Sequence, residues 1–459
     1  MNHKKQPLML HYGVVFVLCL IYGYFAYFLE RAQTTYLLLG FCSLWGLSAY
    51  IIARSPRNWC WDLSIGLLFR LTMLAALPNL SQDFYRFIWD GYLTAHGLNP
   101  YLYAPVEILR DPSLIDLVVP NGNALVTGMG SLNAGHFTNY PPIMQWLFAV
   151  PHWLGIKALL SQVISLRILL IAADIVVFFA GRGLLKQLDL PQHRINWYFL
   201  NPFIIIELSG NLHFEGVMLC ALTLGLLALS YQRYSWAGWS IGASVLIKLI
   251  PLMFLPLLLR HIAHPLKSFR SYAKGISLFM ASITLVFLIA VLPYASGYGW
   301  QHYTQTTALW FTNFEFNASV YYLIRWVGYQ WVGYNLIGLV GPALSLMVFA
   351  GILTLAWAND LSKISGLIKV MLWSIALYLL LATTVHPWYW ATPLLLSLFT
   401  SYRFAILGSL LIMLSYTGYH ESGVQEHAVW LTLEYLGIFG LAFYEILKKS
   451  KPRTPHLAP

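Results

Sequence analysis

Long apolar stretches, separated by short polar breaks, run along almost the whole chain. A helix that crosses a bilayer needs about 20 consecutive apolar residues, and many of these stretches approach that length. A membrane β-barrel would instead show weakly alternating segments of about 10 residues, a pattern that the sequence lacks. We therefore predict an all-α polytopic membrane protein with about 12–14 transmembrane helices. The predicted spans are residues 8–28, 35–53, 62–80, 161–184, 197–212, 214–231, 236–249, 251–262, 276–293, 333–357, 370–385, 388–400, 404–418 and 429–447.

The composition agrees with this interpretation. Of the 459 residues, 59% are hydrophobic and only 10% are charged, whereas a soluble domain carries about 25% charged residues. A soluble chain of this composition would lack the polar groups to cover its own surface. We expect a single integral membrane domain over residues 1–459, in which the pair of spans around Pro251 is also compatible with one broken helix.

The positive charges predict the orientation. The net charge is +10, and most of the 27 Lys and Arg residues fall on one side if the N-terminus is placed in the cytoplasm. This excess of cytoplasmic Lys and Arg is typical of membrane proteins, and it places both termini inside. The basic balance therefore indicates topology, not nucleic-acid binding. The residues counted as cytoplasmic are Lys4, Lys5, Arg54, Arg57, Arg182, Lys186, Arg194, Arg233, Arg260, Lys267, Arg270, Lys274, Lys363, Lys369, Arg403, Lys448, Lys449, Lys451 and Arg453.

The same orientation places the two longest polar intervals on the outer side. They are residues 81–142, between the third and fourth spans, and residues 294–332. The stretch 143–157, which follows the two prolines of NYPP, is ambiguous. If it crossed the membrane, the basic segment 186–194 would move outside. We predict an interfacial or re-entrant helix for it, with aromatic residues at the level of the headgroups.

The first outer loop opens with charged residues at helical spacing, in QDFYRFIWDG. Asp83 and Asp90 are seven residues apart and would share one face of a helix, while Arg86 is within pairing distance of both. One interpretation is a salt-bridged helix at the membrane edge. The other is a carboxylate that acts as a general base, oriented by Arg86, which would contribute about 10²–10⁴-fold in rate.

Lys248, in VLIKLIPLMFLP, is predicted near the outer face, where positive charge is disfavoured. It either extends to the headgroup region or binds a phosphate group. Arg167, at the outer start of the fourth predicted span, is a candidate for a second phosphate contact. Arg70 and Asp174 lie deeper in the apolar segments, and we interpret them as a structural ion pair.

Two further polar clusters lie at predicted outer helix ends. GNLHFEG contributes His213 and Glu215, and VHPWYW contributes His386 and Trp388. Each cluster is either a polar turn or belt anchor, or one edge of a binding site for sugar or lipid. The spacing of His213 and Glu215 is poor for a zinc pair, and the four cysteines form no CxxC pair. We predict no metal site and no cofactor.

Taken in order, these motifs resemble a known family. The segments QDFYRFIWDG, GLNPYLYAP, NYPPIMQ, NPFIIIELSGNLHFEG, KLIPLMFLP, NFEFNASVY and HPWYW span roughly residues 80–390. They occur in the same order in bacterial polyprenyl-phosphate-mannose-dependent mannosyltransferases of the GT-C fold. Asp83 matches the catalytic aspartate of that family, although many relatives have two acids where this chain has Gln82–Asp83. Some further residues are candidates either for binding the substrate or for supporting the residues that bind it. They are Tyr140, in NYPP, and Asp90, His213, Glu215, His386 and Trp388.

The resemblance implies a membrane glycosyltransferase. Its donor would be a polyprenyl-phosphate sugar, most simply mannose, and its acceptor a glycolipid or glycan on the extracytoplasmic side of a bacterial inner (plasma) membrane. Asp83 would act as the general base, and Lys248, with Arg86 or Arg167, would stabilise the departing phosphate. Membrane lipids are the other expected partners. This chemistry does not need a divalent metal.

A different class of function fits part of the same pattern. A transporter or flippase of lipid-linked sugars would use the outer aromatic and cationic residues to bind cargo without catalysis. Transporters also carry polar groups near the midplane and the inner face, for alternating access. The inner breaks of this chain are plain basic loops, so the asymmetry favours the enzyme.

Overall fold

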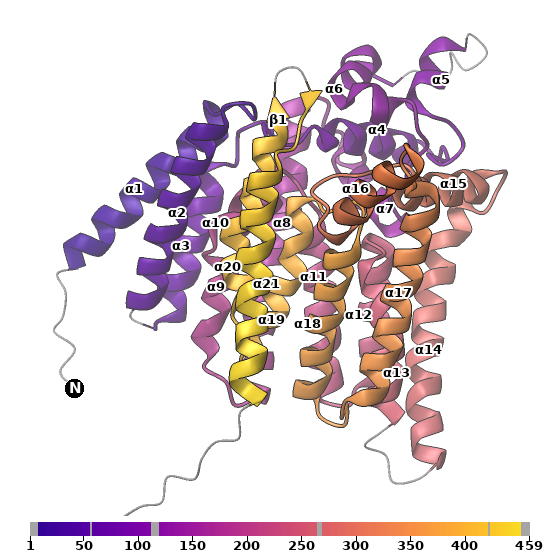
Figure 1. Ribbon diagram of the computed structural model, residues 1–459. Helices are drawn as coiled ribbons and strands as arrows, with labels where there is room; N and C mark the ends of the chain where they lie inside the picture. The colour runs from indigo at the N-terminus through magenta and orange to yellow at the C-terminus, as the bar shows by residue number, and fades with distance from the viewer. Residues whose placement is uncertain (1–7, 56, 112–118, 264–268, 421–422, 451–459) are drawn as a thin grey trace, which may run out of the picture.

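The computed structural model describes residues 8–55, 57–111, 119–263, 269–420 and 423–450. Within these ranges the chain is a bundle of helices, with strand formed only by a short antiparallel hairpin of β1 (Tyr419–His420) and β2 (Gly423–Val424) (Figure 1). The terminal charges Lys4, Lys5, Lys451 and Arg453, and Lys267 of an inner loop, lie outside the described residues.

Seven helices of the described chain are long and apolar enough to cross a membrane, and the number rises to eight if one bent pair forms a single span. This confirms the predicted all-α polytopic membrane protein. The seven are α1 (Leu8–Tyr27), α2 (Thr34–Arg54), α8 (Leu159–Gln187), α14 (Phe269–Val291, extended by η5, Leu292–Tyr294), α17 (Ile337–Ala358), α18 (Ile364–Leu381) and α21 (Ala428–Ser450).

The other predicted spans are shorter or broken helices, so the 12–14 predicted spans are not all long helices. Proline explains several breaks, because it lacks the N–H that continues a helix. Near Pro251, for example, α12 ends at Ile247 and the chain resumes as a 3₁₀ turn. These elements are α3 (Trp59–Thr72), η2 (Gln192–Ile195), α9 (Asn196–Phe199), α12 (Tyr234–Ile247), η4 (Ile250–Phe254), α13 (Leu255–Ala263), η6 (Pro387–Trp390), α19 (Ala391–Leu398), α20 (Phe404–Leu411) and η7 (Ile412–Gly418).

A sharply bent pair of helices brings polar groups into the apolar interior. α10 (Pro202–Ile204) continues into η3 (Ile205–Gly210), a π-helical turn, and α11 (Glu215–Ser230) follows at an angle of 113°. Leu212, at the bend, has a φ of 62°, a left-handed conformation that is uncommon for a branched side chain. π-helical turns are frequent at functional sites. The bend directs Glu207, His213 and Glu215 inward, and all three are buried.

Both predicted outer loops are largely helical and lie at one end of the bundle (Figure 1). The first contains α4 (Asp83–Ala95), α5 (Pro105–Arg110) and α6 (Gly122–Ala134), and the second contains α15 (Gly299–Thr312) and α16 (Val320–Val332). The ambiguous stretch forms α7 (Pro142–Trp153), whose 12 residues are too few to cross a bilayer. α1 begins and α21 ends at the opposite end of the bundle.

Close contact between α4 and α7 fixes the position of α4. At Gly91 a Cβ atom would lie only 2.1 Å from the backbone oxygen of Phe148, so only glycine allows the two backbones to approach this closely. Phe87 of α4 stacks on Phe148, with ring centroids 4.3 Å apart. This packing holds α4, and with it Asp83, against the outer end of the bundle.

Candidate functional site

Asp83 is the first residue of α4, at the end of the bundle that the sequence predicts to be outer. The N-terminal end of a helix carries a partial positive charge that favours a carboxylate. Asn133 of α6 donates a weak hydrogen bond of 3.4 Å to Asp83 Oδ1, and Gln82 donates to the backbone oxygen of Met129 at 3.1 Å. These two bonds hold α6 beside Asp83, whose side chain is half-buried.

The charge on Asp83 depends on its neighbours. Burial raises the pKa of the Asp83 carboxyl above its ordinary value, while the positive charge of Lys248 and the hydrogen bond from Asn133 oppose that rise. A carboxyl with a raised pKa is a stronger base than an exposed aspartate. The arrangement therefore suits proton abstraction by Asp83.

Lys248 lies where α12 gives way to the 3₁₀ turn η4, in an extended conformation with φ −146° and ψ 139°. Its Nζ atom forms an ion pair of 3.0 Å with Glu215 Oε1 and lies 5.4 Å from the centre of the Tyr140 ring. Glu215 is fully buried, whereas the Lys248 side chain retains 18% exposure. The Lys248 side chain is thus only partly covered, and it lines the groove described below.

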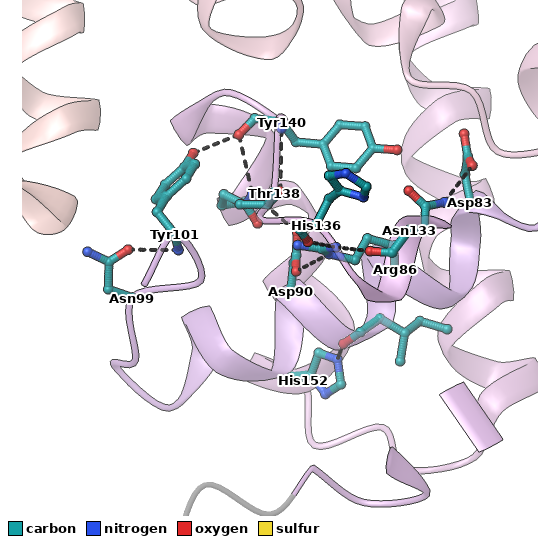
Figure 2. A network of polar contacts seen from close by, with 12 residues as sticks. Asp83, Arg86, Asp90, Asn99, Tyr101, Asn133, His136, Thr138, Tyr140 and His152 are labelled. Atoms are coloured by element: carbon teal, nitrogen blue, oxygen red, sulfur yellow. Dashed lines mark hydrogen bonds and ion pairs between the residues drawn. The ribbon is translucent and has the colours of Figure 1, made fainter. Parts of the chain in front are cut away.

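Arg86 and Asp90 brace the connection between α6 and α7. Arg86 Nε donates to Asp90 Oδ1 at 2.7 Å, and its Nη1 donates to the backbone oxygens of Asn133 at 2.7 Å and His136 at 3.0 Å (Figure 2). Of the two predicted partners, Arg86 therefore pairs with Asp90. Burial raises the pKa of the Asp90 carboxyl, and the charge of Arg86 opposes this effect.

Tyr140 is held by the same polar network. Its backbone oxygen accepts hydrogen bonds from Tyr101 Oη at 2.7 Å and from Gln145 Nε2 at 3.3 Å (Figure 2). Gln145 also donates to Thr138 Oγ1 at 3.0 Å. This network therefore positions Tyr140 and Asn133. Arg86 and Asp90 themselves are buried.

Arg167 takes a different place from the predicted phosphate contact. Its guanidinium is fully buried and donates to the backbone oxygens of Leu74, Ala76, Ser209 and Gly210, at 2.5–2.8 Å. These four bonds tie α8 to the bent helix pair and to the end of α3. The predicted ion pair of the apolar interior is present, because Arg70 Nε lies 2.9 Å from Asp174 Oδ2.

His213, Trp388 and His386 form a continuous stack of rings. The His213 and Trp388 ring centroids are 3.6 Å apart, and those of Trp388 and His386 are 4.6 Å apart with an interplanar angle of 7°. Burial lowers the pKa of His386 to about 3, and the positive charge of Lys248 adds to this effect. The stack is therefore an uncharged wall close to Lys248. His213 Nε2 lies 3.6 Å from Oε2 of the buried Glu207.

An apolar groove of about 370 Å³ begins beside Lys248 and Tyr140. One wall follows α17, a helix long and apolar enough to cross the membrane. Its lining residues are three or four positions apart and therefore share one face of that helix. On α17 they are Gly341, Ser345, Val348 and Ile352. The rest of the lining includes Met253 of η4, Tyr378 and Leu381 of α18, and Trp310 and Phe311 of α15. The groove extends from a charged outer end along a spanning helix.

Two residues of this site escaped the sequence analysis. Arg31, in the outer turn after α1, lies 4.4 Å above the Tyr419 ring, and its positive charge also opposes the rise in the pKa of Asp83. The predicted topology places Arg31 on the outer side, where Lys and Arg are less common. This departure from the charge pattern could have marked Arg31 as a candidate site residue. Asn133 lies on α6, a helix that the sequence analysis did not predict.

The described part of the chain contains no group of three or more His, Cys, Asp and Glu residues that could hold a metal ion. Asp83, Glu215 and Lys248 instead form a mixed set of two carboxylates and one cation. Such a set can bind an anion through Lys248 and accept a proton at Asp83. The expectation that no cofactor or metal is needed stays a prediction.

Comparison with known proteins identifies relatives of this chain. A family model described as alpha-(1->6)-mannopyranosyltransferase, N-terminal domain, matches residues 25–264, which is more than half of the chain. The alpha-(1->6)-mannopyranosyltransferase A of Mycobacterium tuberculosis is 24% identical over 350 residues, which cover 70% of this chain but only 62% of that protein. Asp83, Glu215 and Lys248 lie inside the matched family region. The chain therefore belongs to the alpha-(1->6)-mannopyranosyltransferase family.

Proposed function

We propose that this protein is a membrane mannosyltransferase that moves mannose from a polyprenyl-phosphate donor to a glycan or glycolipid acceptor, with Asp83 as the general base. Family membership supports the sugar and the reaction class. One observation carries the proposal: the positive charge of Lys248, which lines an apolar groove along a spanning helix, acts on the carboxyl group of Asp83.

The groove and Lys248 together fit the two parts of a lipid-phosphate donor. The isoprenoid tail would occupy the groove between α17 and α18, where its contacts are apolar. The phosphate would then lie beside Lys248, whose ammonium group is a compact charge suited to phosphate. Binding energy from the tail is remote from the reacting atoms and can hold the sugar in position for reaction.

Asp83 would accept the proton of the acceptor hydroxyl. The hydroxyl oxygen forms a bond to the anomeric carbon, while the bond from that carbon to the phosphate oxygen breaks. Its electron pair leaves with the polyprenyl phosphate, whose added negative charge Lys248 stabilises. An in-line displacement of this kind needs one carboxylate and inverts the anomeric centre. All protons and electrons are accounted for without a metal.

Arg86 and Arg167 have other roles in this proposal. Both guanidinium groups are buried and bonded to backbone oxygens, so we assign the donor phosphate to Lys248 alone. Arg86, with Asp90, positions the segment that carries Asn133 and Tyr140. His213, His386 and Trp388 would form an uncharged wall beside the reacting sugar, and Glu215 would hold Lys248 until the phosphate arrives.

The proposed setting is the outer side of a bacterial plasma membrane. α4, which begins with Asp83, lies at one end of the bundle, and α21, whose last turn carries Lys448, ends at the other. The names of the family and of the mycobacterial relative support an α-(1→6) linkage in the product.

The test is mannose transfer by purified full-length protein. Synthetic polyprenyl-phosphate mannose would be the donor, and α-(1→6)-linked mannosides of increasing length the acceptors. We expect transfer by the wild type and a loss of about 10²–10⁴-fold in kcat for Asp83→Asn. Asp189→Asn is the matched control, because this aspartate lies on an inner turn with φ 54°, a conformation that asparagine also adopts. Transfer by Asp83→Asn at the rate of the control would remove Asp83 from the role of base.

A further inference from the structure

A second cavity, of about 620 Å³, lies on the other side of α4. Tyr85, Ile88, Tyr92 and His96 of α4 line it and recur every three or four residues, so they share one face of the helix. With about 100° of rotation per residue, Asp83, Arg86 and Asp90 fall on the opposite face. α4 therefore separates two compartments. Figure 2 shows His152, which lines the cavity, on the side of α4 away from Asn133 and Tyr140.

The cavity has an aromatic wall. The Tyr92 and His96 ring centroids are 4.0 Å apart, with an interplanar angle of 31°. The ring of His152, from the end of α7, meets Tyr92 edge-on at 5.7 Å and 84°. Tyr92 and His152 are half-buried, and His96 is exposed. Aromatic rings of this kind offer apolar faces, together with polar atoms at their edges.

Both histidines are arranged to accept hydrogen bonds. His96 Nδ1 lies 2.8 Å from the backbone oxygen of Tyr92, and His152 Nε2 lies 3.0 Å from that of Ile88. A carbonyl oxygen can only accept a hydrogen bond, so these two ring nitrogens are the donors. In a neutral imidazole the other ring nitrogen is then free to accept a hydrogen bond. Burial lowers the pKa of His152, which keeps that ring neutral. The complementary ligand supplies hydroxyl groups as donors.

The remaining lining favours a neutral ligand over an anion. Among the described residues that line the cavity, Lys157 is the one Lys, Arg, Asp or Glu, and it is exposed. Gln162 is buried and donates its amide to the backbone oxygen of Ile156 at 2.9 Å. A phosphate site would instead gather several cations or free backbone N–H groups. The volume is within the range of about 300–1,000 Å³ that is usual for small-molecule sites.

We propose that this cavity is a second carbohydrate-binding site, which holds non-reacting sugar units of a neutral oligosaccharide on the face of α4 opposite Asp83. The C–H face of a hexose would pack on Tyr92, and its hydroxyl groups would donate to His96 Nε2 and His152 Nδ1. The identification of this oligosaccharide as the acceptor rests on the proposed function. Tyr85, which lines the cavity, is two residues from Asp83 along α4, so an acceptor that occupied both compartments would pass over the start of this helix.

The test measures binding of linear α-(1→6)-linked mannohexaose and mannobiose to the full-length protein in lipid nanodiscs without donor. We expect the wild type to bind the hexaose more tightly than mannobiose. His96→Phe keeps a ring beside Tyr92 but removes the acceptor nitrogen, and we expect it to weaken hexaose binding about tenfold. His420→Phe, at an exposed histidine of β1, is the matched control and should bind as the wild type.

Several outcomes would overturn this inference. Equal hexaose affinity for His96→Phe, Tyr92→Ala and the wild type would show that the cavity does not bind the glycan. A larger loss in Lys157→Ala than in His96→Phe would indicate an anionic ligand. The proposed function fails separately: hexaose binding that depends on His96, without any mannose transfer, would retain the site and reject the enzyme.

Discussion

Lys248 and Glu215 belong to neighbouring helices, and their 3.0 Å ion pair joins the end of α12 to the start of α11. Glu215 is fully buried, so it needs this partner, whereas Lys248 is partly exposed and has a charge to offer a ligand. The pair therefore combines a structural role with a proposed functional one. Variants at the two positions can separate these roles.

We predict that Lys248→Met lowers both stability and transfer. Removing one partner of a buried ion pair costs about 3–5 kcal/mol, because the other charge is left without compensation. The double variant Lys248→Met/Glu215→Gln removes both charges and should recover most of the stability while transfer remains lost. Thermal unfolding in detergent and initial rates of transfer would be measured in parallel. Recovery of transfer in the double variant would leave Lys248 with a structural role only.

Asn133 offers a test through the pH dependence of the reaction. Its hydrogen bond lowers the pKa of the Asp83 carboxyl, so Asn133→Ala should raise that pKa. A base acts in its deprotonated form, which is lost as pH falls through its pKa. The acidic limb of kcat/KM should therefore move to higher pH in the variant. Asn123→Ala, at an exposed position of the same helix, should leave the profile in place. An unmoved limb in Asn133→Ala would contradict the assignment of Asp83.

The helix α4 depends on a close crossing with α7 at Gly91. Gly91→Ala places a Cβ atom against the backbone oxygen of Phe148, which cannot move as a flexible side chain can. We expect a loss of at least about 1–3 kcal/mol in stability and a fall in transfer, because Asp83 would shift with α4. Gly46→Ala is the control, since no atom lies within 4 Å of a Cβ there. Unfolding temperatures and transfer rates of the two variants would be compared.

At the scale of elements, apolar runs predicted the helices of the bundle well. The predicted span 404–418 coincides with Phe404–Gly418, and 429–447 lies within Ala428–Ser450. In the layer above the bundle, helical spacing indicated α4, and an interfacial helix was predicted where α7 lies, but α5 and α6 were not predicted, because they are short and no long apolar run marks them. A polar helix is stabilised by its contacts with the rest of the molecule, which a local pattern does not contain.

The site could be predicted only in part for the same reason. Helical spacing gave the pairing of Arg86 with Asp90, which is local. The backbone partners of Arg167 come from two distant segments, at 74–76 and 209–210, so the sequence offered no sign that its donors are already used. The pairing of Lys248 with Glu215 is likewise a property of helix packing. Candidate residues were thus easier to predict than their partners.

The two ends of the whole molecule differ. The layer of α4–α7, which begins with Asp83, lies at the end that the sequence predicts to be outer, and α21 ends at the opposite end with Lys448 and Lys449 in its last turn. A transferase that receives a lipid-linked donor needs polar chemistry at one surface only. A transporter needs access from both. The asymmetry therefore supports the transferase at the scale of the entire chain.

The central claim is tested most directly in proteoliposomes that contain polyprenyl-phosphate mannose with labelled mannose. Mannotriose would be supplied outside, and both new mannosidic bonds and movement of donor between the leaflets would be measured. We predict that labelled mannose appears in the acceptor, that one polyprenyl phosphate is released per bond, and that Asp83→Asn abolishes both. Donor that crosses the bilayer in a protein-dependent way, without transfer to any acceptor, would contradict the account and identify a transporter.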